Sequence, residues 1–292
     1  MVWFGVSLLT FETMRKAEHS GSITHISAEK SLSGYFWELR YQWQFLYFLT
    51  WKELKVRYRN LILGLLWATL QPLIYVAALV FVSGLNKMGG GDELPFPLFI
   101  FCGLIFWQLF TSVINGSVQM LISNASIMRK VYFPKFLLPL SAALVSLVEL
   151  IPAVLILIGL SVYCGFSLPI LMLPILIVGV VITLIGGIGI AGILSLGVLR
   201  FPSMRHAIPL LLHVLLFVSP ILYGLNSGIM DGPLKFVALA IPISGPIDAL
   251  RQALIGVPSF DILAISGIVS CVLLIIGFLN FFFNEDKVID HA

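Results

Sequence analysis

The sequence predicts an all-α integral membrane protein with six transmembrane helices and both ends in the cytoplasm. Hydrophobic residues make up 59% of the 292 residues and charged residues only 11%, whereas an average soluble domain has about 45–50% and about 25%. The charges are spaced so that long apolar stretches separate them, and about 20 mainly apolar residues form one spanning helix. These stretches lack the alternation of a transmembrane β-strand, which argues against a barrel.

The apolar stretches between charges give the position of each span. We expect helices near residues 62–83, 95–118, 137–162, 170–196, 207–224 and 262–283. Four stretches hold one helix each. The longest stretch, from Lys135 to Arg200, contains Glu149 as its only charge and holds two helices, separated at the turn-like segment 164–169.

The distribution of Lys and Arg predicts the orientation, because these residues accumulate on the cytoplasmic side of a membrane. With the N-terminus inside, fourteen of the 17 Lys and Arg residues lie in inner segments. The outer loops then hold only Lys87, Lys235 and Arg251.

The chain divides into four predicted regions. Residues 1–34 form a polar cytoplasmic extension of low order, whose start lacks the basic region and cleavage site of a signal peptide. Residues 35–59 form an aromatic amphipathic interface helix and a basic segment, residues 60–284 the transmembrane domain, and residues 285–292 a cytoplasmic tail. Two interpretations of the aromatic helix stay open: it lies in the membrane interface, or it packs on protein.

The basic segment directly precedes the first predicted span. Its minimal role is a topology signal and an anchor to anionic lipid. A second hypothesis is that it receives the anionic headgroup of a substrate. The residues of this hypothesis are Lys55, Arg57, Tyr58 and Arg59.

Two loops have distinctive patterns. In the inner loop after the second span, Ser123 or Asn124 can cap a helix, and Pro134 discourages continuation past Phe133. The result is a short helix at the cytoplasmic face, which is either a knob that docks into a partner or simply a positively charged loop. The last outer loop, about 225–260, is rich in Gly and Pro around short apolar pieces, which we interpret as short re-entrant helices at the outer edge.

The sequence contains no recognisable active site. No G-x-x-x-x-G-K-[ST] loop is present to hold nucleotide phosphates, and the Cys and His residues have no metal-ligand spacing. We therefore expect no catalytic residue, no metal and no cofactor in this chain. Glu149 is the one acid within the predicted spans, and His213 is the histidine within them; we interpret both as structural, and proton coupling is the alternative.

Several motifs resemble, in order, those of ABC-2 type permeases that export O-antigen, capsular polysaccharide or teichoic acid. They lie at 51–59, 63–67, 71–72, 94–99, 103–107, 129–135, 138–140, 218–223 and 285–290. The resemblance extends from about residue 35 to the end. Two departures are Arg200–His206, where the family has an Arg-Asp pair, and Ile241-Pro242, where it has Asn-Pro.

The resemblance implies a homodimer in the bacterial cytoplasmic (inner) membrane, served by two copies of a separate ATPase subunit that binds ATP and Mg. It implies that the inner-loop helix is the coupling helix seated in that ATPase, with the residues Asn124, Ser126, Met128, Arg129, Lys130, Tyr132, Phe133 and Pro134. It also implies a channel between the two copies, lined by the first and fifth spans. The aromatic residues Trp67, Tyr75 and Trp107 either stack on sugars there or pack within the protein.

The expected function is therefore a transport subunit, not an enzyme, that exports a lipid-linked polysaccharide while in contact with membrane lipid and without nucleic acid. In the expected mechanism, ATP closes the pair of ATPase subunits, the coupling helices move with them, and the polymer advances outward. One alternative is an ABC-2 exporter of teichoic acid, a drug or haem. Another is a membrane enzyme of lipid-linked sugar assembly.

Overall fold

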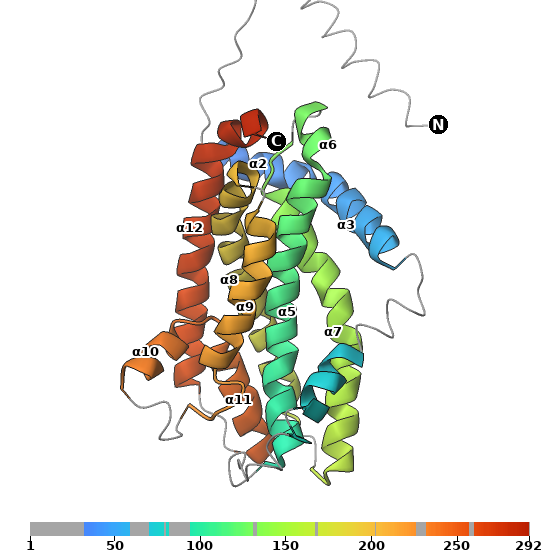
Figure 1. Cartoon of the computed structure of the whole chain (residues 1–292), viewed down its shortest axis with the longest axis vertical. Coiled ribbons are helices and arrows are strands. Elements are labelled where there is room, and N and C mark those ends of the chain that lie inside the picture. The colour runs from blue at the N-terminus through green and yellow to red at the C-terminus, as the bar shows by residue number, and fades with distance from the viewer. Residues whose placement is uncertain are drawn as a thin grey trace, which may run out of the picture. The chain divides into compact units, whose positions relative to one another are not determined.

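The computed structural model describes residues 32–58, 70–78, 80–81, 94–130, 133–166, 169–201, 203–225, 232–256 and 260–291. Within these ranges the chain is helical and has no strand (Figure 1). The chain forms two compact units, Met1–Glu38 and Leu39–Ala292. Helix α2 (Leu32–Tyr41) begins in the first unit, and all features below belong to the second.

Four helices of the described ranges are long and apolar enough to cross a membrane: Phe96–Ser123, Leu137–Tyr163, Met172–Ser195 and Asp261–Asn284. They lie in α5 (Phe96–Ser123), α7 (Leu137–Tyr163), α8 (Met172–Arg200) and α12 (Asp261–His291), which run alongside one another in Figure 1. They correspond to the predicted second, third, fourth and sixth spans. The prediction of an all-helical, multi-pass architecture is thus confirmed for these four helices.

The other two predicted spans, the first and the fifth, do not appear as long apolar helices in the described residues. Helix α9 (Met204–Val218) has 15 residues, about 22 Å at 1.5 Å per residue, so it is shorter than the predicted 207–224 span. It ends before Pro220, which has no backbone N–H to continue the helix. Of the predicted first span, residues 70–78 and 80–81 are helical, and the rest lies outside the described residues. The count of six spans therefore stays a prediction.

The remaining described helices are short connections at the ends of the bundle. Helix α3 (Trp43–Arg57) precedes the first predicted span, and α6 (Ala125–Lys130) occupies the first part of the predicted inner-loop helix. Helices α10 (Pro233–Leu239) and α11 (Ser244–Ile255) lie in the segment predicted as the last outer loop, where short helices were expected.

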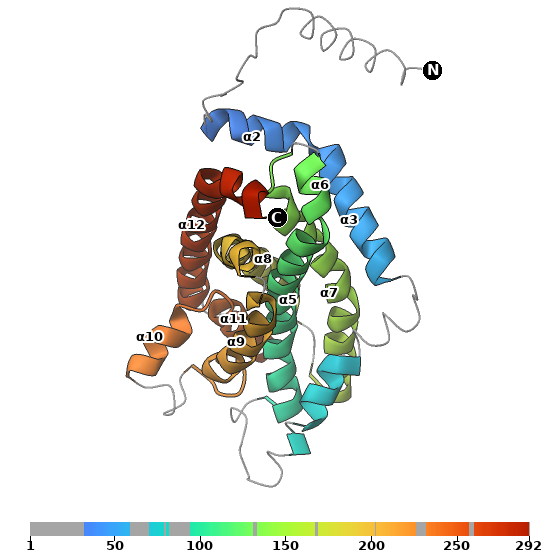
Figure 2. The ribbon, with the colours of Figure 1, turned by 45° about the horizontal axis from the view of Figure 1, so that its top comes forward.

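Helix α5 forms the centre of the second unit, because its apolar side chains are buried almost throughout, including Phe101, Phe106 and Phe110. It packs against α7, α8, α9 and α11 (Figure 2). Aromatic and branched side chains from all of these helices interdigitate around it and form one continuous core. This position makes α5 the element that touches both of the sites described next.

Helices α8 and α12 approach each other backbone to backbone. A Cβ added at Gly277 would collide with the carbonyl oxygen of Gly189, so only glycine permits this separation. One helical turn further along, the Asn280 Nδ2 group donates to the carbonyls of Gly192, at 3.3 Å, and Ile193, at 3.2 Å.

Candidate functional site

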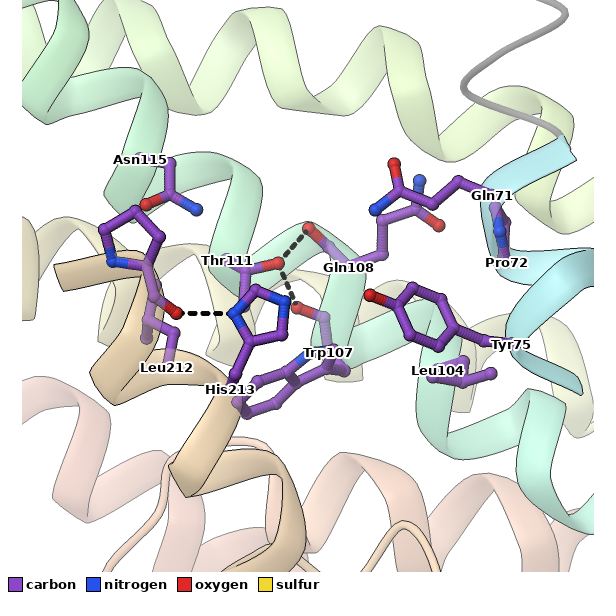
Figure 3. A pocket seen from close by; sticks show the side chains of 11 residues that line it. Gln71, Pro72, Tyr75, Leu104, Trp107, Gln108, Thr111, Asn115, Leu212 and His213 are labelled. Atoms are coloured by element: carbon purple, nitrogen blue, oxygen red, sulfur yellow. Dashed lines mark hydrogen bonds between the residues drawn. The ribbon is translucent and has the colours of Figure 1, made fainter. Parts of the chain in front are cut away.

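A partly open cleft with a volume of about 110 Å³ lies between residues 71–75, the middle of α5 and the middle of α9 (Figure 3). A cavity needs roughly 10–15 Å³ per water by the same measure, so the cleft holds several water molecules or part of a larger polar ligand.

One face of α5 forms the base of this cleft. Leu104, Trp107, Gln108, Thr111 and Asn115 line it, and their spacing of three or four residues places them on one helical stripe. Such a polar stripe is unusual on a helix that is otherwise this apolar. In the sequence, the signal for this stripe is Gln, Thr and Asn at helical spacing within an apolar stretch.

The two other walls add aromatic and hydrogen-bonding groups. Gln71, Pro72 and Tyr75 come from the first wall, and Pro209, Leu212 and His213 come from α9. The cleft therefore combines two aromatic residues on separate elements with several amide, hydroxyl and imidazole groups. It offers stacking faces and hydrogen bonds without a net charge.

Internal hydrogen bonds orient the polar side chains of the cleft (Figure 3). Thr111 Oγ1 lies 2.9 Å from the carbonyl oxygen of Trp107 and 3.1 Å from that of Gln108. The Nδ1 atom of His213 lies 2.6 Å from the carbonyl oxygen of Pro209. Since a carbonyl oxygen only accepts, Nδ1 must carry the proton, which leaves Nε2 to interact with a ligand.

Two of the three predicted channel aromatics meet in this cleft. Tyr75 is 37% exposed, whereas Trp107 is only 7% exposed and its ring centroid lies 6.2 Å from that of Phe110. Trp67 lies outside the described residues. His213, expected to be a structural residue with proton coupling as the alternative, also lines the cleft. The role of the three aromatic residues in contacting sugar stays a prediction.

Glu149, on α7, lies in a second polar site. The Arg57 Nη1 group, at the end of α3, donates to Glu149 Oε1 at 2.6 Å. The Ser112 hydroxyl of α5 donates to Oε2 at 2.5 Å. The Tyr58 hydroxyl lies 3.4 Å from Oε1, and burial followed by the negative charge of Glu149 raises the pKa of Tyr58 to about 12. This hydroxyl therefore stays protonated and can donate a hydrogen bond to the carboxylate.

The predicted headgroup-receiving residues fall into two groups, according to whether they contact Glu149. Arg57 and Tyr58 contact Glu149, while Lys55 is exposed and lies 5.3 Å from the centroid of the Trp51 ring. The Trp51 ring stacks with that of Tyr47 at 6.4 Å and an interplanar angle of 9°. Arg59 lies outside the described residues. Lys55 is thus the member of the set that is placed on an exposed aromatic face.

Helix α3 also contacts the inner loop. The Lys52 Nζ group donates to Asn124 Oδ1 at 2.6 Å, and Asn124 Nδ2 donates to the Met120 carbonyl at 2.8 Å. Further along the chain, the ring of Phe45 lies 4.7 Å from that of Phe133. The inner loop is therefore attached to α3 at two points.

The predicted coupling residues separate into an outer and an inner group. Ser126 and Lys130 are exposed, whereas Asn124, Met128, Phe133 and Pro134 are buried. The side chain of Arg129 and the whole of Tyr132 lie outside the described residues. The buried group holds the loop in place and the exposed group is available to a partner; docking to an ATPase stays a prediction.

Arg251 is a structural anchor that sequence reasoning missed, since it was counted only as a positive charge in an outer loop. Its side chain is 4% exposed and donates to the carbonyls of Phe99, Pro220 and Ile221 at 3.1, 2.7 and 2.8 Å. The guanidinium carbon also lies 3.5 Å from the centroid of the Phe99 ring. Burial lowers the pKa of Arg251 to about 10, so it stays cationic at neutral pH. Arg251 thus joins the ends of the two helices, α5 and α9, that line the cleft.

Few acidic side chains lie near either site among the described residues. The described residues contain no group of three or more His, Cys, Asp or Glu side chains that could hold a metal ion. In the part of the chain that the structure describes, Glu149 is the carboxylate of the second site, and Arg57 pairs with its charge.

The chain is similar to O-antigen export permeases and to a polysialic acid transport protein. It is 27% identical over 250 residues to the O-antigen export system permease protein RfbA of Klebsiella pneumoniae, covering 84% of this chain and 93% of that protein. It is 28% identical over 193 residues to RfbA of Myxococcus xanthus, covering 66% and 73%. It is 31% identical over 180 residues to the polysialic acid transport protein KpsM of Escherichia coli, covering 60% and 68%.

No family model matches the chain. The matches to individual proteins nevertheless cover most of the second unit, where the four long apolar helices and both polar sites lie. The polysialic acid transport protein is related at a level of identity that establishes common ancestry over two thirds of its length. The chain therefore belongs to the family of ABC-2 type polysaccharide-export permeases.

Proposed function

We propose that this chain is the membrane-spanning permease subunit of an ABC transporter that exports polysaccharide. The observation that carries the proposal is the match to an O-antigen export permease over 93% of that protein's length. The cleft supports it, because uncharged hydrogen-bonding groups and aromatic faces suit a sugar polymer, which has hydroxyl edges and apolar ring faces.

The permease itself would not be an enzyme. Hydrolysis of ATP would belong to a separate ATPase subunit, which binds ATP and Mg. The exposed part of the inner loop, at Ser126 and Lys130, is the surface that such a subunit would contact. We further propose that two copies of the permease form a homodimer with two ATPase subunits, and that the glycan passes between the copies.

The substrate would be a lipid-linked glycan, taken from the inner leaflet of a bacterial cytoplasmic membrane. Lys55 lies at the end of the exposed Tyr47–Trp51 stack. Aromatic rings at this position suit the headgroup region of a bilayer, and a neighbouring cation attracts a phosphate. The same surface suits an interfacial position for α3.

Deletion of the gene in its native host tests the proposed function. We expect loss of one surface polysaccharide and accumulation of its lipid-linked form on the cytoplasmic side, with restoration by the wild-type chain. Unchanged surface glycan, with loss of teichoic acid, drug or haem export instead, would reassign the substrate. Glycan assembly by the isolated chain in vesicles would instead indicate an enzyme.

The topology has its own test. On the proposed arrangement, with both ends inside, a cysteine replacing exposed Phe236 of α10 should react with an impermeant thiol reagent from outside. A cysteine replacing exposed Ser126 of α6 should react only in inverted vesicles. The reverse pattern would overturn the orientation.

A further inference from the structure

An ion pair lies a little less than half way along a helix that is long enough to span the membrane. Glu149 follows Leu137, the first residue of α7, by twelve residues, which is about 18 Å along the helix axis. A charged side chain at such a depth is costly and is retained when it faces protein or water. Arg57 satisfies Glu149 at 2.6 Å, and the two side chains are 29% and 16% exposed.

The same ion pair ends a path of contacts that begins at the inner loop. Lys52 of α3 binds Asn124, at the junction of α5 and α6, through a 2.6 Å hydrogen bond. Five residues further along the same helix, Arg57 binds Glu149 of α7. An α-helix transmits displacement along this distance as a rigid rod, because its backbone hydrogen bonds fix the spacing at about 1.5 Å per residue.

The carboxylate of Glu149 in turn contacts α5, the helix that forms the base of the cleft. It accepts a hydrogen bond from Ser112, which follows Gln108 by one turn of α5. Gln108 lines the cleft, and it also lines a small cavity of about 10 Å³ beside Glu149. The guanidinium of Arg57 also packs against the α5 backbone, since a Cβ at Gly116 would lie 3.4 Å from Nη2. The ion pair and the cleft therefore share the same turns of α5.

We propose that the Arg57–Glu149 ion pair is a positioning element that transmits movement of the inner loop to the cleft, so that ATP hydrolysis on the partner advances the substrate. This inference rests on the proposed function. With the pair intact, α3 cannot move with the loop unless α7 and, through Ser112, α5 move too. Without the pair, α3 retains its contacts with the loop but loses its charged link to α7 and, through Ser112, to the cleft-lining helix α5.

The test uses the complex of this permease with its ATPase, reconstituted in vesicles with lipid-linked glycan extracted from the native membrane. Two rates are measured, ATP hydrolysis and glycan export. We expect Glu149→Gln to keep the ATPase rate within about twofold but to lower the glycan exported per ATP by about five- to tenfold, the range of a modest coupling energy. Glu53→Gln, the same change on α3 itself, is the matched control and should behave as wild type.

A charge exchange separates positioning from simple stability. Arg57→Glu combined with Glu149→Arg restores an ion pair, so we expect it to recover export per ATP relative to either single change. If Glu149→Gln fails to assemble, Ser112→Ala removes the link from the carboxylate to α5 and should lower the same ratio, whereas Ser146→Ala removes the other partner of the Ser112 hydroxyl and leaves the carboxylate link in place, so it is the control.

The inference is overturned if assembled Glu149→Gln exports as much glycan per ATP as wild type. Where Glu149→Gln does not assemble, the same result for Ser112→Ala overturns it. So does equal loss of export and of assembled complex, without a change in the ratio. Absence of export by the wild-type complex would instead count against the proposed function, so the two failures are distinguishable.

Discussion

The closest helix packing in the described part of the chain makes a quantitative prediction about Gly189→Ala. A Cβ added at Gly189 would lie 2.5 Å from the carbonyl carbon of Leu273 and 2.6 Å from the nitrogen of Leu274. Ordinary contact begins at 3.4 Å, so α8 and α12 would have to separate by the difference, about 0.9 Å, and backbone atoms cannot rotate away as a side chain can.

The energetic cost follows from this separation. Overpacking of a well-packed interior costs about 1–3 kcal/mol, and moving the helices apart also weakens the hydrogen bonds from Asn280, worth about 0.5–1.5 kcal/mol each. Alanine regains about 1 kcal/mol of helix propensity over glycine. The net expectation is a loss of about 1–3 kcal/mol, or a fall of several degrees in the melting temperature at about 2–4 °C per kcal/mol.

The assay is the thermal loss of the monodisperse peak of detergent-purified protein in size-exclusion chromatography. Gly267→Ala is the matched control, because it lies on α12 and its nearest neighbour would be Ile182 Cδ1 at 3.7 Å, an ordinary contact. We expect this control to be neutral or more stable than wild type. A melting temperature for Gly189→Ala equal to or above that of the control would refute the packing argument.

Three further predictions follow from the site. Trp107→Ala should reduce glycan export by at least several-fold with the ATPase rate unchanged. Trp43→Ala, at an exposed position of α3 outside both the cleft and the Tyr47–Trp51 stack, is the control and should export as wild type; equal effects of the two changes on export per ATP would contradict the role of the cleft. Arg251→Lys keeps the charge, but the lysine ammonium cannot reach all the carbonyls that the guanidinium satisfies. We therefore expect the free energy of unfolding to fall by about 1–3 kcal/mol, measured as a lower melting temperature. Wild-type stability of this variant would show that these bonds are dispensable. Joint replacement of Arg129 and Lys130 by Glu should uncouple ATP hydrolysis from export at normal protein levels, and normal export in that double variant would remove the inner loop from the coupling path.

Long apolar helices were predictable from the sequence because charge is nearly excluded from them. The predicted spans 95–118 and 137–162 correspond to Phe96–Ser123 and Leu137–Tyr163. The fifth span was predicted too long because apolar residues continue past the helix end, and hydropathy does not register that Pro220 cannot continue the hydrogen-bond ladder. Helix ends depend on backbone hydrogen bonds, and span assignment depends on composition.

The polar contacts were much less predictable. Arg57 and Glu149 are separated by 92 residues, and no local pattern indicates that they meet. Their positions led to separate hypotheses, a headgroup site and an isolated intramembrane acid, which the structure combines into one ion pair. The cleft was only partly predictable: Tyr75 and Trp107 stood out as aromatics, but their meeting with His213 depends on how the segment 70–78 and α9 pack against α5.

The most direct test of the central claim is transport by the purified system. The permease is reconstituted in vesicles with its ATPase subunit, ATP and lipid-linked glycan, and glycan that becomes sequestered from an external glycosidase is measured over time. We predict sequestration that requires both proteins and ATP hydrolysis, with no hydrolysis by the permease alone. ATP hydrolysis by the isolated permease, or glycan movement that continues without the ATPase, would contradict the account.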